Sequence, residues 1–336
     1  MYNTALTKLI PKLRAKVRMS EVEMLQLVGS VPVVEVNSIE ADVERASSTF
    51  SRQLDEWGFM ALEIPGIRAM NAEVMENFRV ACQSATPSLM DYVYTRVPQM
   101  AVGGNHGFFP MFSEIPRLAQ GVADPKEFLH ISGAIIEDLP PGSGAVLEAF
   151  SDLGHNAESL FDVGFNVASS IGRVICQIMT DESSVNLGLS RYSSILRLVH
   201  YIVSDQRDVL AHEHSGIQML GVQFPPSDRG LQYILNDGRW AEPEIPNTDI
   251  VLCNIGRMLT KASAGRFRPS THRVHRSSGE VTYERWSNVL FCHPDHRSQQ
   301  WIIEEGSRSI TVLDSLWGEF VGDMVRGLGI EAEAGD

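Results

Sequence analysis

The spacing of apolar residues divides the chain into a helix-rich first half and a strand-rich second half. Apolar or small residues recur every three to four positions in several long segments, which is typical of helices with one buried face. These segments predict helices at about 2–28, 38–57, 69–84, 145–180 and 313–328. From residue 194 onward the apolar runs are short and separated by turn signals. They predict strands at 195–202, 217–223, 231–235, 249–254, 270–276, 283–292 and 299–303.

Three short apolar runs also predict strands in the first half, at 31–36, 59–64 and 126–131. The glycine-rich segment 103–110 reads as an irregular loop, and Pro140-Pro141-Gly142-Ser143-Gly144 is the clearest break in the chain. Many short strands at this spacing favour a sandwich or a barrel, and a jelly roll fits. The pattern therefore predicts an α+β protein with a jelly-roll core and flanking helices.

Composition and charge exclude several classes of function. The chain has 336 residues, 43% of them hydrophobic, which is enough for a large globular core. The formal net charge of -14 argues against a nucleic-acid partner. No apolar run approaches the roughly 18 residues of a membrane span. Residues 1–18 carry five basic side chains and no acidic one, which indicates a solvated helix face or a docking arm. The four cysteines are widely separated, as expected of buried thiols in the reducing cytoplasm.

Two histidines separated by one residue form the first chemical motif. His212 and His214 lie between apolar runs that read as strands. Residues i and i+2 of a strand point to the same face, so the two imidazoles would form a short chelate. His272 is the best third ligand, because a strand there can lie opposite the first, whereas His275 would face the other way. We expect a metal site at His212, His214 and His272; histidines packed in the core are the plain alternative.

An arginine and a serine on one face of an apolar strand form the second motif. Arg285 and Ser287 alternate with apolar neighbours in the run 283–291. A buried guanidinium needs an anionic partner, and its planar fork matches a carboxylate. The partner is either a small-molecule carboxylate or an acidic side chain of the same protein.

Taken in chain order, these motifs and their neighbours resemble the iron(II)/2-oxoglutarate-dependent dioxygenases, in the branch that includes isopenicillin N synthase. In the first half, Val31–Val36 and Trp57-Gly58-Phe59 are similar to the opening strand and the "WGFF" turn of that branch. In the second half, the matching landmarks are Leu196–Tyr201 for the strand with the co-substrate tyrosine, His212–Gly216 for His-x-Asp-x-Gly, Gly230-Leu231-Gln232 with Gly238-Arg239-Trp240 for the "GLQV…G.W" hairpin, Asn254-Ile255-Gly256 for "N.GD", Ser270–Val274 for the distal-histidine strand and Arg285-Trp286-Ser287 for Arg-x-Ser.

The resemblance covers about residues 30–300 and implies a double-stranded β-helix. It divides the chain into an N-terminal helical arm (1–29), a mixed helix-rich region (30–190), the jelly-roll core (191–305) and a C-terminal helix and tail (306–336). It implies Fe(2+), 2-oxoglutarate and O2 as cofactors, with Arg285, Ser287 and Tyr201 holding the co-substrate carboxylate. The segment with His106 and Phe108 resembles a substrate-facing loop, although a surface loop is an equal alternative. His130 and His200 read as structural, and His293 and His296 read as surface residues.

The chain departs from the family pattern at the metal. His214 stands where the family has its aspartate ligand, which removes one negative charge from around the metal. Three interpretations stay open: a three-histidine iron site, a site in which Glu213 or Asp208 replaces His214, or a site without chemistry. Arg257 and Val199 also replace the family's usual Asp and Asn.

We therefore predict a non-haem iron oxygenase that oxidises a small, possibly biosynthetic, molecule by hydroxylation, desaturation or cyclisation, with 2-oxoglutarate as co-substrate. One alternative is an oxidase or cyclase of the isopenicillin N synthase type that uses no 2-oxoglutarate. A non-catalytic binding protein on the same scaffold is the other. The sequence predicts neither the substrate nor the oligomeric state.

Overall fold

The protein is represented by a computed structural model of residues 1–336. The structure describes residues 42–85, 87–92, 105–115, 121–138, 145–180, 187–202, 208–276 and 284–295, with the short segments 25–26, 34–35, 39, 95–96, 302–305 and 308–311. The predicted helix at 313–328 and the whole of the basic segment 1–18 lie outside these residues.

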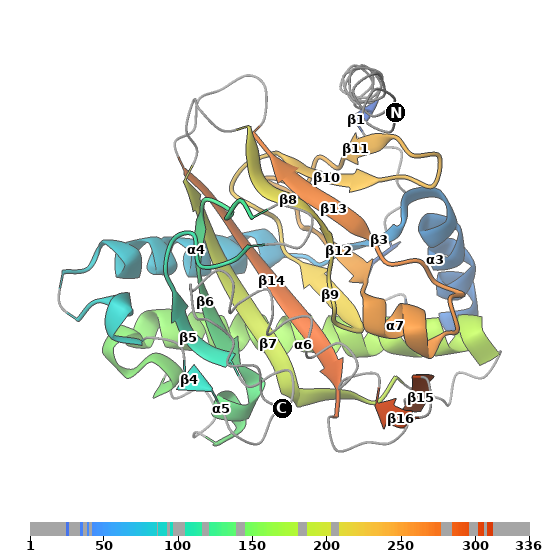
Figure 1. The fold of residues 1–336 in the computed structure, drawn as a ribbon, viewed down its shortest axis with the longest axis horizontal. Coiled ribbons are helices and arrows are strands. Elements are labelled where there is room, and N and C mark those ends of the chain that lie inside the picture. The colour runs from blue at the N-terminus through green and yellow to red at the C-terminus, as the bar shows by residue number, and fades with distance from the viewer. Residues whose placement is uncertain are drawn as a thin grey trace, which may run out of the picture.

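Two β-sheets form the centre of the molecule (Figure 1). The five-stranded minor sheet has the order β1 (Leu25–Gln26), β11 (Trp240–Glu242), β10 (Leu231–Ile234), β13 (Thr271–His275) and β8 (Val209–Ser215). The nine-stranded major sheet has the order β2 (Val34–Glu35), β3 (Phe59–Glu63), β12 (Ile250–Ile255), β9 (Leu220–Gln223), β14 (Glu284–Pro294), β7 (Leu189–Ile202), β6 (Lys126–Ser132), β5 (Asn105–Phe109) and β4 (Thr95–Arg96). Neighbouring strands are antiparallel except β1 with β11 and β2 with β3. A separate hairpin joins β15 (Ile302–Glu305) and β16 (Arg308–Thr311).

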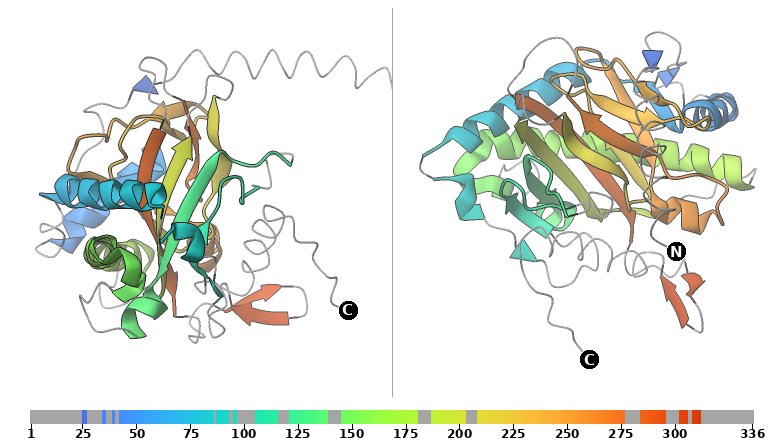
Figure 2. Two further views of the ribbon diagram at one scale, coloured as in Figure 1. Left: turned by 90° about the vertical axis from the view of Figure 1, so that its left-hand side faces the viewer. Right: turned by 45° about the horizontal axis from the view of Figure 1, so that its top comes forward.

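Three long helices cover one face of the major sheet. They are α3 (Val43–Trp57), α4 (Ile67–Gln83) and α6 (Ser151–Thr180); shorter helices are η1 (Leu89–Tyr92), α5 (Gly133–Asp138), η3 (Ala145–Phe150) and α7 (Arg257–Ala262). Figures 1 and 2 show α4 and α6 crossing behind the strands. Helix α6 packs closely on the sheet: a Cβ added at Gly164 of α6 would lie 2.8 Å from the ring of Phe224, which directly follows β9.

Local sequence signals explain where α3 begins and ends. Asp42 accepts a hydrogen bond from the backbone N–H of Arg45 at 2.9 Å, which caps the first turn. Gly58 has φ of 75° and ends the helix in the left-handed conformation that glycine adopts without strain. The chain then enters β3 directly, as the predicted helix and strand on either side of Gly58 require.

Two separate cores hold the layers together. The larger core lies between the helices and the major sheet and includes Phe50, Phe78, Phe161 and Leu290. The smaller one contains residues of both sheets, such as Tyr201, Leu210 and Tyr233. This arrangement confirms the predicted α+β jelly roll with flanking helices.

Two sequence predictions of local structure were wrong. Residues 105–109, expected to form a loop, form β5, which pairs with β6. Burial of Phe108 and Phe109 there outweighs the low strand propensity of Asn and Gly. Leu25 and Gln26, expected in a helix, form β1 beside β11, so tertiary pairing overrides the helical pattern at its end. No helix in the described part of the chain combines the length and apolar character needed to cross a bilayer.

Candidate active site

A cavity of about 370 Å³ lies within the jelly roll. This volume is in the range of small-molecule sites. Its walls come from β6, β7, β8, β13, β14 and the start of α7, so residues from both sheets meet in it. Six charged side chains contribute to the lining, which is unusual for an interior space: Glu114, Lys126, Arg197, Glu213, Arg257 and Arg285.

Two of the predicted metal ligands are neighbours in this cavity. His214 of β8 and His272 of β13 are directly paired across the strands, with ring centroids 4.4 Å apart. Each ring has its Nδ1 beside a backbone carbonyl oxygen, at 2.7 Å from His212 O and 2.9 Å from Ser270 O. A carbonyl only accepts, so Nδ1 carries the proton in both rings. The lone pair of each neutral ring is therefore on Nε2, where a metal would bind.

The surroundings keep both rings uncharged. Burial lowers the pKa of His272 to about 3, and the neighbouring His214 contributes to the shift. Burial also lowers the pKa of His214, with a further contribution from Lys126. Neutral imidazole is the form that ligates metals, so neither ring has to lose a proton at neutral pH.

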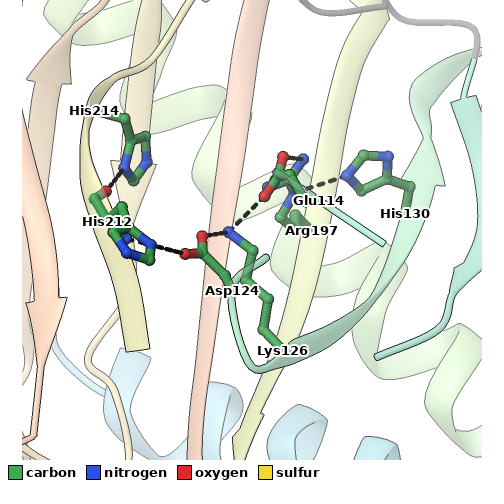
Figure 3. Close-up of polar contacts among 7 residues, drawn as sticks. All are labelled: Glu114, Asp124, Lys126, His130, Arg197, His212 and His214. Atoms are coloured by element: carbon green, nitrogen blue, oxygen red, sulfur yellow. Dashed lines mark hydrogen bonds and ion pairs between the residues drawn. The ribbon is translucent and has the colours of Figure 1, made fainter. Parts of the chain in front are cut away.

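The third predicted ligand is directed elsewhere. His212 Nδ1 lies 2.6 Å from Asp124 Oδ1, and the same oxygen accepts the backbone N–H of His212 at 3.1 Å (Figure 3). The potential ligand atoms of His212, His214 and His272 do not all lie within 4.8 Å of one another. The pairing of β8 with β13 shifts register just beyond His272, where simple strand alternation no longer holds. The structure thus brings together two of the three histidines.

Asp124 also begins a chain of buried ionic contacts (Figure 3). Lys126 Nζ lies 2.9 Å from Asp124 and 2.5 Å from Glu114. Arg197 Nη1 lies 3.3 Å from Glu114, and Arg197 Nε donates to His130 Nε2 at 2.7 Å. Two acids and two bases alternate, so the cluster is close to neutral as a whole.

Mutual attraction keeps these groups ionised despite their burial. Burial raises the pKa of Glu114, but Arg197 and Lys126 outweigh it and hold the pKa below its usual value. Burial likewise lowers the pKa of Lys126, but Asp124 and Glu114 outweigh it and raise the pKa above its usual value. A permanent positive charge therefore lies on the wall next to the two histidines.

The predicted carboxylate-binding group lies in the same cavity. Arg285 is only 2% exposed, and its Nε donates to the carbonyl oxygen of Arg229 at 3.0 Å. Its Nη1 and Nη2 are buried and have no hydrogen-bond partner among the described residues. Tyr201 lies with its ring centroid 5.4 Å from the guanidinium carbon, and Ser287 Oγ accepts from Gln223 at 2.7 Å. Two unsatisfied guanidinium nitrogens fit a bidentate carboxylate, as 2-oxoglutarate would present.

The two residues expected to face the substrate do not line the cavity. His106 Nδ1 accepts the backbone N–H of Ser132 at 3.3 Å, and Phe108 is buried in the larger core. The prediction that His293 is a surface residue was wrong: it is 2% exposed and lines the cavity. Strand β14 continues to Pro294, past its predicted end at residue 292, and His293 lies on the same face as Arg285, Ser287 and Phe291, which also line the cavity.

Sequence reasoning missed the ionic cluster of Asp124, Lys126, Glu114 and Arg197. Glu114 precedes the nearby pair Asp124 and Lys126 in the chain, but Arg197 comes from a distant strand, and no spacing rule connects it to them. The one available signal was Lys126 at the start of an otherwise apolar strand.

Comparison with known proteins finds a matching family model and several similar solved structures. A family model described as the 2OG-Fe(II) oxygenase superfamily matches residues 192–294. No curated protein sequence matches the chain. Among solved structures, Neurospora crassa T7H in complex with alpha-KG aligns with a TM-score of 0.67 and 20% identity, over 87% of this chain and 96% of that one.

Two bacterial structures are similar to the same extent. An oxygenase from Shewanella oneidensis aligns with a TM-score of 0.62 and 21% identity, over 89% of this chain and 99% of that one. A 2OG-Fe(II) oxygenase family protein from Caulobacter crescentus aligns with a TM-score of 0.65 and 21% identity, over 87% and 98%. At these identities the structures show a common fold. The matched segment 192–294 contains all three histidines and Arg285, so the part of the chain that forms the candidate site is the part that matches the 2OG-Fe(II) oxygenase superfamily.

Proposed function

We propose that the protein oxidises a small polar molecule in the cavity between its sheets, with 2-oxoglutarate as co-substrate and a metal centre of histidines alone. The observation that carries this proposal is the convergence of His214, His272 and the unsatisfied guanidinium of Arg285 on one cavity. Iron bound there would supply the oxidising chemistry, and the reaction would be a hydroxylation, a desaturation or a ring closure.

Different residues would bind the metal and the co-substrate. His214 and His272 would hold the metal through Nε2, while the carbonyls of His212 and Ser270 fix their orientation. Arg285 would bind the far carboxylate of 2-oxoglutarate, with Ser287 and Tyr201 beside it. His212 would have to leave its contact with Asp124, 2.6 Å away, to complete a three-histidine site.

The substrate would lie against the ionic cluster. Lys126, Arg197 and Glu114 line the cavity and are largely buried, so a polar substrate group would find both donors and acceptors there. Related structures hold chemically different small molecules: T7H is described in complex with thymine, and JOX2 in complex with JA. A screen for substrates of this protein should therefore begin with small polar molecules that carry hydrogen-bonding groups.

The proposal is tested by oxygen-dependent formation of succinate from 2-oxoglutarate by protein loaded anaerobically with Fe(II). We expect turnover in the wild type and at least a tenfold loss in His272→Ala, which removes a ligand. His155→Ala, on the exposed side of α6, is the control and should behave as wild type. Substrate oxidation without succinate would favour the oxidase or cyclase of the isopenicillin N synthase type, because Arg285 could equally hold a substrate's own carboxylate.

His214→Asp distinguishes the open interpretations of the metal site. If the scaffold has merely lost its carboxylate, the variant binds Fe(II) more tightly and forms succinate faster. If His214 is a working ligand, the variant loses the native reaction. Fe(II)-loaded wild type that neither consumes oxygen nor forms succinate or an oxidised product would contradict the proposal.

A further inference from the structure

A second cluster of potential metal ligands lies on the opposite face of the major sheet. In the register of β6, β7 and β14, Lys126, Tyr201 and Arg285 are paired with one another and face the cavity. The next residues along, Glu127, His200 and Trp286, are also paired and therefore point away from it. Helix α4 covers this outer face and brings Cys82, near its C-terminal end, to the same place.

The ligand atoms of this cluster are already close. One ligand atom each from Cys82, Glu127 and His200 lie within 4.8 Å of one another. His200 Nδ1 is 2.8 Å from Glu127 Oε1. The other ring nitrogen, Nε2, is buried, has no hydrogen-bond partner among the described residues, and lies 3.9 Å from Glu284 Oε1. Ligand atoms around a tetrahedral zinc ion lie about 3.5 Å apart, so small side-chain movements would suffice.

The ring of His200 is held in place by its neighbour. Trp286 stacks on it with centroids 3.9 Å apart and planes 3° from parallel. His200 is 7% exposed, and Trp286 is also 7% exposed. A fixed, buried imidazole between two carboxylates and a thiol is an arrangement that a metal ion can use without reorganising the backbone.

We propose that Cys82, Glu127 and His200 bind a divalent zinc-like cation, with Glu284 on the far side of the ring as a second source of negative charge. The donor set of one sulfur, one nitrogen and carboxylate oxygens matches zinc, and it differs from the all-nitrogen set in the cavity. The two carboxylates bring negative charge to a partly buried place. The nearby cation on α4, Arg79, is bonded to Glu76 on the helix surface at 2.5 Å. A bound cation would offset this charge and displace the thiol proton of Cys82.

Such a site would fasten the end of α4 to β6 and β7 of the major sheet. The opposite faces of these two strands carry Lys126 and Tyr201, so the ion would stabilise the wall of the active site without touching the reactants. Its role would be structural, and it does not depend on the proposed oxidation.

The test uses Co(II) as a spectroscopic substitute for zinc in the full-length protein. A thiolate ligand gives an intense sulfur-to-cobalt charge-transfer absorption in the near ultraviolet, which the histidine site in the cavity cannot produce. We expect this band in the wild type and in His272→Ala, in which the cavity site is impaired. Zinc added in equal amount should abolish it.

Variants show whether Cys82 is the ligand. Cys82→Ser should lose the band and bind Zn(II) at least tenfold more weakly in a competition with a chromophoric chelator, and Glu127→Gln should weaken binding in the same direction. Cys176→Ser, at a buried thiol in α6, keeps the number of cysteines equal and should retain the band. A wild-type protein without the band, or a band of equal strength in Cys82→Ser, would overturn the proposal even if a variant folds poorly.

Discussion

Burial decides the charge of the histidines in the cavity, one residue at a time. His272 and His293 both have a pKa of about 3, in each case mainly because of burial. The His272 ring makes a defined hydrogen bond to a carbonyl, whereas His293 Nδ1 has no hydrogen-bond partner among the described residues. The effect of burying an uncharged imidazole on the free energy of unfolding at low pH can therefore be measured at His293.

The free energy of unfolding should depend on pH through His293. In the unfolded chain its pKa is near the ordinary 6.5, so below that pH the unfolded state binds a proton that the folded state refuses. Stability from this group is complete above about pH 6.5 and is lost as the pH falls toward 3. His293→Gln should flatten the stability curve over this window by up to about 1.4 kcal/mol per pH unit. Urea unfolding at several pH values measures it.

The matched control for this measurement is His155→Gln, at an exposed position of α6. It makes the same substitution without removing a buried ring, so it shows how much of the change in slope comes from the position of His293. If the His293→Gln and wild-type curves stay parallel between pH 6.5 and 4, the burial argument for this residue fails.

Arg285 is the second buried residue in the cavity with polar atoms that lack a hydrogen-bond partner among the described residues. Both Nη atoms are buried without a partner among the described residues. A ligand can therefore accept two parallel hydrogen bonds from the planar guanidinium, in addition to being attracted by its charge. Arg285→Lys should weaken 2-oxoglutarate binding by about 10- to 100-fold, as expected for the loss of a charged hydrogen bond, in calorimetric titration with Mn(II) present. Arg191→Lys, in an exposed pair with Asp162, should bind as wild type. If both variants bind 2-oxoglutarate with equal affinity, Arg285 does not bind the co-substrate.

At the scale of elements, β13 is the strand that assembles the site. It pairs with β10 on one side and β8 on the other, and it carries His272. Its end is held at Gly230, whose carbonyl accepts the N–H of His275 at 2.8 Å. Gly230 has φ of 108°, and an added Cβ would collide with the carbonyl oxygen of His275.

This contact predicts a difference between two glycine variants. Gly238 has φ of 85° but open space around an added Cβ, so Gly238→Ala should cost only the backbone strain, about 1 kcal/mol. Gly230→Ala should cost about 1–3 kcal/mol more, because the collision adds to the strain. Denaturant unfolding of both variants gives the difference. Equal losses would mean that β10 and β13 can separate at this point without cost.

For the whole molecule, the charge around the metal is the unusual feature. In the proposed metal site His214 takes the place of a carboxylate ligand, and the neighbouring ionic cluster of two acids and two bases adds no net charge to compensate. Before 2-oxoglutarate binds, the ligands of a divalent metal there would all be neutral imidazoles, and the 2-oxoglutarate dianion would supply the first negative charge. Metal and co-substrate should therefore bind cooperatively.

Thermal unfolding with Mn(II), with 2-oxoglutarate and with both tests this cooperativity. Each ligand alone should stabilise weakly, and the two together should exceed the sum by about 1–3 kcal/mol of coupling free energy. In His214→Asp the excess should shrink, because the aspartate supplies the charge beforehand. Strictly additive stabilisation in the wild type would contradict the argument.

The sequence by itself determined the architecture and pointed to a family resemblance. Hydrophobic periodicity located α3, α4, α6 and most of the strands, because these elements bury one face and alternate accordingly. The order of short motifs from Trp57 to Ser287 indicated the oxygenase superfamily, and the family model agrees over 192–294. The closeness of His214 to His272 and the burial of Arg285 followed from the expected opposition of their strands.

Only the tertiary structure decided where individual side chains turn. Strand alternation placed His212 beside His214, yet the buried carboxylate of Asp124, 88 residues away in the chain, attracts its ring. The ionic cluster in the cavity brings Arg197 to Glu114, and the Cys82–Glu127–His200 group likewise joins distant segments. Periodicity records which face of an element is buried. It contains no information on which distant charge a polar side chain on that face will meet.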